Sequence, residues 1–148
     1  MTTIRAILKC IAATLAAGLA PALVLLALPG ATIGFAVITF IIATVHAVFL
    51  GLPAYFFVSN FGRVKAPLAA LIGCAVGMIP IMLLLLSVHP DMARVDGVAT
   101  YVDGMPTMAG LLNILAFAGI AGCFGAVGAF AFWLTLACGR EHAVKSAA

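Results

Sequence analysis

The sequence contains four long apolar stretches, and none of them includes Asp, Glu, Lys or Arg. They run from about residue 11 to 28, 32 to 58, 66 to 88 and 108 to 138. A helix needs about 20 apolar residues to cross a bilayer, because the hydrocarbon core is about 30 Å thick and each residue advances the helix by about 1.5 Å. Each stretch is therefore near or above the length of a membrane span.

The composition also indicates that lipid surrounds most of the protein surface. Hydrophobic residues make up 66% of the chain and charged residues 7%, whereas a soluble domain has about 25% charged residues. So few charged residues cannot cover a water-facing surface, and most of the protein surface must therefore face lipid. We predict one membrane domain over residues 1–148, an all-α antiparallel four-helix bundle. The net charge of +3 is small and dispersed, which does not favour nucleic-acid binding.

The positions of the basic residues predict the orientation in the membrane. Six of the seven Lys and Arg residues fall in the N-terminal segment, in the link at 59–65 and in the C-terminal tail, which all lie on one side of a four-span chain. The opposite side, the loop at about 89–107, holds Arg94 alone. Because positive residues are retained in the cytoplasm, we expect both termini to be cytoplasmic. The compact Ala- and Gly-rich chain suggests a bacterial cytoplasmic (inner) membrane.

Small residues at helical spacing predict close contacts between helices. In lipid, helices associate by van der Waals packing and hydrogen bonds, and small residues let their backbones approach. The third stretch contains a GxxxG pair, and the fourth has glycines every three residues, which fan around the helix because three residues turn it by about 300°. These glycines either pack inside one bundle or seat another subunit. The candidate packing residues are Gly73, Gly77, Gly119, Gly122, Gly125 and Gly128.

Three of the stretches contain an internal proline: Pro21, Pro53 and Pro80. Proline removes one backbone hydrogen bond and can kink its helix. Membrane helices tolerate such a break when neighbouring groups satisfy the freed carbonyl. Each proline is therefore either a fixed kink or a hinge.

His46 is the ionisable residue closest to the middle of a predicted span. Such residues are functional candidates in membranes, because placing a charge there is unfavourable. On a regular helix His46 shares a face with Thr39, Ala43, Leu50 and Pro53, so we expect it to face the bundle. It either bonds a polar group of a neighbouring helix or takes part in ligand contact or proton transfer. The stretches contain no acidic partner for a proton relay.

Asn113 is the second candidate polar residue within the membrane. It lies just inside the outer end of the fourth stretch, and an Asn in such a position usually forms a hydrogen bond to another helix. Asp91, Asp96 and Asp103 occupy the outer loop. Their spacing matches no calcium-binding loop, so we interpret them as solvated carboxylates.

The sequence lacks the usual signatures of catalysis and cofactor binding. The four cysteines form no C-x-x-C pair, which excludes the common zinc and redox motifs. Ser59 and Ser87 lie at span ends, remote from His46 in depth, so no intramembrane Ser–His pair is expected. We predict no catalytic residue, cofactor or metal, and no enzyme activity. The expected function is that of a non-catalytic accessory subunit that binds other membrane helices; the alternative is a subunit of an oligomeric small transporter or channel.

Overall fold

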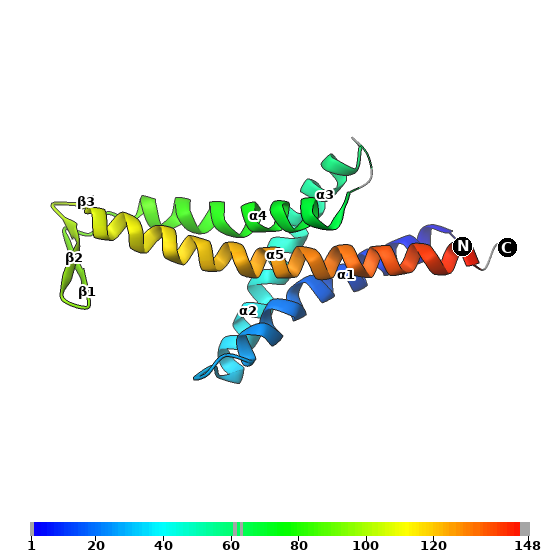
Figure 1. Cartoon of the computed structure of the whole chain (residues 1–148), viewed down its shortest axis with the longest axis horizontal. Helices are drawn as coiled ribbons and strands as arrows, with labels where there is room; N and C mark the ends of the chain where they lie inside the picture. Colours follow the sequence, from blue (N-terminus) through cyan, green and yellow to red (C-terminus); the bar gives the residue numbers. More distant parts are fainter. Residues whose placement is uncertain (1, 61, 63, 146–148) are drawn as a thin grey trace.

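The computed structural model describes residues 2–60, 62 and 64–145, and the side chains of residues 4, 7–60, 62 and 64–137. The chain is mostly helical (Figure 1). Within the described residues, four helical segments are long and apolar enough to cross a membrane: Ile7–Leu26, Ile33–Ser59, Ala66–Ser87 and Met108–Ala137. The chain is therefore a membrane protein by the length and composition of its helices.

The first span belongs to α1 (Thr2–Leu26), and the third and fourth belong to α4 (Ala66–Ser87) and α5 (Met108–Lys145). The second span has three parts: α2 (Ile33–His46), the π-helical segment η1 (Ala47–Gly51) and α3 (Leu52–Ser59). Thr32 caps α2 by accepting a hydrogen bond from the Phe35 backbone N–H at 3.4 Å. A hydroxyl in this position satisfies one of the free N–H groups at the start of a helix.

The π-helical segment follows from Pro53. Proline has no backbone N–H, and its ring clashes with the carbonyl four residues earlier, so a regular α-helical ladder cannot continue across it. The Leu52 N–H instead bonds the Ala47 carbonyl, five residues back, which is the π-helical pattern. This extra residue in the turn shifts the face that the rest of the span presents.

Helix α4 lies beside α5 along most of its own length, and α1 packs on α5 and on α2 (Figure 1). The second span crosses this group obliquely and contacts α4 chiefly at η1. It is also the least covered span: 6% of its most apolar window is buried, against 33% for the first span. Three spans therefore form the packed part of the protein, and the second leans against it.

The outer segment expected as a loop contains a small sheet, so the prediction of an all-α chain is incomplete. Strands β1 (Met92–Val95), β2 (Val98–Val102) and β3 (Met105–Pro106) pair antiparallel in the order β1-β2-β3. The two connections are Asp96-Gly97 and Asp103-Gly104, and all four residues have positive φ. Positive φ at both central residues is the geometry of type I′ hairpin turns, which Asp-Gly favours. Asp96 and Asp103 are therefore turn residues.

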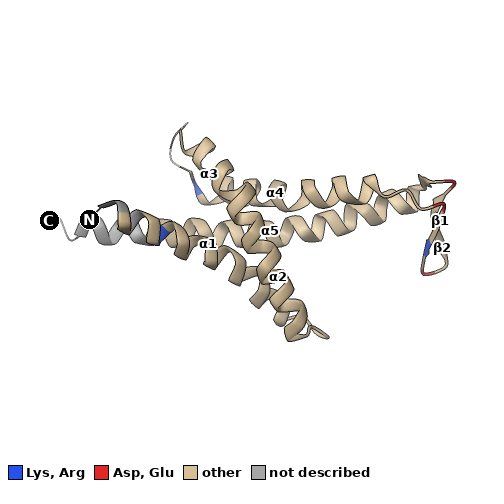
Figure 2. Ribbon diagram, turned by 180° about the vertical axis from the view of Figure 1, so that it is seen from behind, with Lys and Arg blue, Asp and Glu red and all other residues tan. Residues whose placement is uncertain are grey.

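The sheet is fixed to the ends of α4 and α5. The Tyr101 hydroxyl donates to the Leu85 carbonyl in the last turn of α4 at 3.1 Å. The Thr107 hydroxyl donates to the Ala99 carbonyl at 2.7 Å and accepts from the Gly110 backbone N–H at 3.1 Å. A side chain at Gly110 would overlap the Thr100 carbonyl. Figure 2 shows the acidic residues at this end of the molecule.

Candidate functional site

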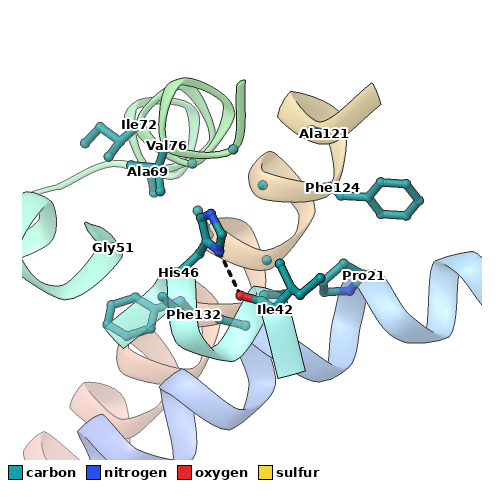
Figure 3. A pocket seen from close by; sticks show the side chains of 18 of the residues that line it. Pro21, Ile42, His46, Gly51, Ala69, Ile72, Val76, Ala121, Phe124 and Phe132 are labelled. Atoms are coloured by element: carbon teal, nitrogen blue, oxygen red, sulfur yellow. Dashed lines mark hydrogen bonds between the residues drawn. The ribbon is translucent and has the colours of Figure 1, made fainter. Parts of the chain in front are cut away.

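A cavity of about 250 Å³ lies among the four spans, around His46 (Figure 3). Its walls come from α1, α2, η1, α3, α4 and α5 and consist largely of small and aliphatic side chains. His46, the last residue of α2, projects into this space. The lining therefore places the His46 ring among the four spans.

 In the lining, Thr39 lies about two turns and Ala43 about one turn before His46 on the same helix.

The π-helical segment decides which residues of the second span line the cavity beyond His46. A regular helix would place Leu50 and Pro53 on the face of His46. In the structure, Ala47, Gly51 and Tyr55 line the cavity, and Leu50 is 41% exposed. One extra residue in a turn rotates everything after it by about 100°. The expected face is therefore correct up to His46 and wrong after it.

The three internal prolines gather around this cavity. Pro21 lines it and is fully buried. Pro53 produces the adjoining π-helical segment. Pro80 leaves the Val76 carbonyl without its α-helical partner, and both Val76 and Ile81, the residue after Pro80, line the cavity. Breaks in membrane helices are tolerated where the backbone is buried in protein or lines a cavity. The prolines of three different spans therefore lie in or beside one site.

The carbonyl freed by Pro21 is covered by a glycine of α5. Proline at position 21 leaves the Ala17 carbonyl without its usual partner four residues later. A Cβ added at Gly128 would lie 2.6 Å from this oxygen, so the Gly128 backbone packs directly against it. Such approaches allow weak Cα–H···O contacts. A side chain at position 128 would therefore clash with this part of α1.

The other predicted packing glycines fall into two groups. Gly73 and Gly77 of α4 meet Gly125 of α5, and a Cβ at Gly77 would lie 2.5 Å from the Ala121 carbonyl oxygen. Gly122 approaches the Cys74 sulfur, which would lie 3.0 Å from an added Cβ. These four glycines therefore lie at contacts between helices of the same chain. A Cβ at Gly119 would meet nothing within 4 Å, so Gly119 faces open space.

His46 forms one hydrogen bond that fixes its ring. Its Nδ1 lies 2.9 Å from the Ile42 carbonyl oxygen, drawn as the dashed line in Figure 3. A carbonyl can only accept, so Nδ1 carries the hydrogen and donates. In a neutral imidazole the other nitrogen, Nε2, is then an acceptor. Within the described residues no partner for Nε2 is present, and in Figure 3 it lies on the side of the ring away from Ile42.

Thr39 adds a second polar group with unused hydrogen-bonding capacity. The hydroxyls of Thr14, Thr44 and Thr135 each donate to the carbonyl four residues earlier, at 2.7 to 2.8 Å. Thr39 also lines the cavity, yet its hydroxyl has no hydrogen-bond partner in the part of the chain that the structure describes. Besides the Tyr55 hydroxyl, the cavity therefore offers His46 and Thr39 as polar groups in an otherwise apolar lining.

Asn113 lies apart from His46. It is half-buried in the second turn of α5 and does not line the cavity. Among the described residues, its side chain forms no hydrogen bond to another helix. The structure therefore does not bring the two predicted polar candidates together. Trp133 instead bonds the link before α4: its indole N–H donates to the Val64 carbonyl at 2.9 Å.

Neither metal binding nor a charged ligand is suggested by the residues around the cavity. The described residues include no group of three or more His, Cys, Asp or Glu side chains that could hold a metal ion. Comparison with known proteins gave no matching family model, no matching curated protein and no matching solved structure. The interpretation of the site therefore rests on its geometry and chemistry.

Proposed function

We propose that this chain is a non-catalytic accessory subunit that binds another membrane protein through its second span. The observation that supports the proposal is the incomplete packing of that span. Its small residues Ala43, Ala47 and Gly51 follow the spacing of a helix-packing stripe. A Cβ at Gly51 would meet atoms of its own helix alone within 4 Å, whereas Gly73, Gly77 and Gly125 each approach another helix.

The stripe supports an intermolecular contact for an energetic reason. Glycine within a helix is less favourable than alanine by about 1 kcal/mol in soluble hosts, and close packing normally offsets this difference. Gly73 and Gly77 have such packing within the chain; Gly51 does not. Since Ala43, Ala47 and Gly51 also line the His46 cavity, a partner helix seated beside η1 would supply this packing at the edge of the cavity.

We further propose an antiparallel bundle in the bacterial inner membrane with both termini in the cytoplasm. The distribution of Lys and Arg supports this orientation, and the sheet between α4 and α5 would then lie outside. A cysteine introduced at Val98 should react with an impermeant thiol reagent added to intact cells. A cysteine at Lys65 should react only after the membrane is opened. The opposite labelling pattern would overturn the orientation.

Purification in mild detergent followed by mass spectrometry tests the accessory function. We expect a second membrane protein in fixed ratio with the wild-type chain and its loss from Gly51→Leu. Gly119→Leu is the matched control, because Gly119 is also open but lies on α5. Equal retention of the partner by both variants would contradict a docking role for the second span.

The alternative is a subunit of an oligomeric small transporter or channel. The cavity beside the π-helical interruption of the second span favours it, since transporters often place sites at broken helices within the membrane. This alternative gains if copies of this chain alone purify as a defined oligomer. Flux measurements with His46 variants would then test transport directly.

A further inference from the structure

We infer that the cavity around His46 binds a neutral, lipid-soluble alcohol or phenol whose hydroxyl donates a hydrogen bond to His46 Nε2. This inference goes beyond the accessory function and does not depend on the identity of a partner protein. It follows from the tautomer of His46, the absence of charge in the lining and the size of the cavity.

The tautomer determines the chemistry of the ligand. The bond from Nδ1 to the Ile42 carbonyl at 2.9 Å leaves Nε2 as an acceptor in the neutral ring. A ligand that can only accept, such as an ether or ketone, would leave this nitrogen unpaired. A hydroxyl donor satisfies it, and its own oxygen can in turn accept a bond from Thr39 if the ligand reaches that hydroxyl.

The lining determines the charge and polarity of the ligand. It contains no Asp, Glu, Lys or Arg, and His46 is its one basic side chain. An ionised ligand would enter without a counter-charge, which is unfavourable in a membrane interior. The remaining lining is aliphatic and aromatic, with Ile72, Val76 and Phe132 among its side chains. The body of the ligand should therefore be apolar.

The volume of the cavity limits the size of the ligand. An apolar cavity of about 150 Å³ admits benzene, so the 250 Å³ here accommodates a molecule somewhat larger, such as two fused rings. The close contact of Gly73 and Gly77 with α5 closes one side. Entry from the membrane is available beside α2, because α4 meets the second span chiefly at η1.

The test uses 1-naphthol as the probe and 1-methoxynaphthalene as its matched control, which has a similar ring system but no hydroxyl donor. The full-length chain, with ¹⁵N-labelled histidine, is placed in lipid nanodiscs. His46→Phe identifies the His46 resonances among those of the three histidines. We expect 1-naphthol to shift the Nε2 resonance of His46 saturably, and 1-methoxynaphthalene at the same concentration to leave it unchanged.

Affinity measurements on variants provide an independent result. A neutral hydrogen bond contributes about 1 kcal/mol net, so His46→Phe should weaken 1-naphthol binding about fivefold to tenfold, while His89→Phe should not change it. Equal shifts from both probes, or no shift from either, would overturn the inference even if His46→Phe fails to fold. If Nε2 is already bonded in the untreated protein and loses that bond on dilution to monomers, the occupant is a side chain of another copy, and the inference is wrong.

Discussion

Substituting Gly77 by alanine should separate α4 from α5. The added Cβ would lie 2.5 Å from the Ala121 carbonyl oxygen and 3.3 Å from the Gly125 Cα. Carbon and carbonyl oxygen normally approach to about 3.3 Å even in Cα–H···O contacts, so the helices must move apart by roughly 0.8 Å. Both obstacles are backbone atoms, which cannot rotate away as a side chain could.

The expected loss of stability follows from this overlap. Inserting a methyl group into a well-packed interior typically destabilises a protein by about 1 to 3 kcal/mol, which corresponds to a change of about 5- to 160-fold in the unfolding equilibrium constant. Gly119→Ala is the matched control, because the same methyl group on α5 would meet nothing within 4 Å. Any gain in helix propensity from alanine applies to both variants.

Reversible unfolding in mixed detergent micelles, followed by circular dichroism, measures the difference. Gly77→Ala should unfold at a lower denaturant fraction than the wild type, and Gly119→Ala at the same or a higher fraction. Equal midpoints for the two variants would refute the close α4–α5 contact on which the fold depends.

Three further perturbations test other parts of the structure. Trp133→Phe should lose the 2.9 Å bond to the Val64 carbonyl and lower the free energy of unfolding by about 0.6 kcal/mol; an unchanged value would show that this bond contributes nothing. Gly104→Val should disrupt the second hairpin turn, where φ is 73°, by about 1 to 2 kcal/mol, and increase proteolysis within 92–106, with Gly119→Val as the unstrained control. Pro53→Ala should restore the α-helical ladder across η1 and weaken 1-naphthol binding, because Ala47 and Gly51 would turn away from the cavity; unchanged binding would contradict the role assigned to the π-helical segment.

The sequence alone determined the membrane character and the four spans. Charged residues are so unfavourable in hydrocarbon that their absence from four stretches predicts helices almost regardless of tertiary context. The close packing of Gly73, Gly77 and Gly125 was also predictable in kind, because small residues mark helix contacts in lipid. The hairpins carried a sequence signal as well: Asp96-Gly97 and Asp103-Gly104 each lie between apolar residues, the pattern of a tight turn.

The tertiary structure determined which neighbouring helix each of these residues contacts. Glycines spaced by three fan around α5, so Gly122 and Gly125 meet α4, Gly128 meets α1 and Gly119 meets neither; spacing alone cannot say which neighbour lies in each direction. The cavity could not be predicted, because it depends on how residues from four separate spans converge. Which residues of the second span face the cavity after His46 depended on the π-helical segment. A helix can accommodate Pro53 by a kink or by an added residue in the turn, and the surrounding helices determine which of the two occurs.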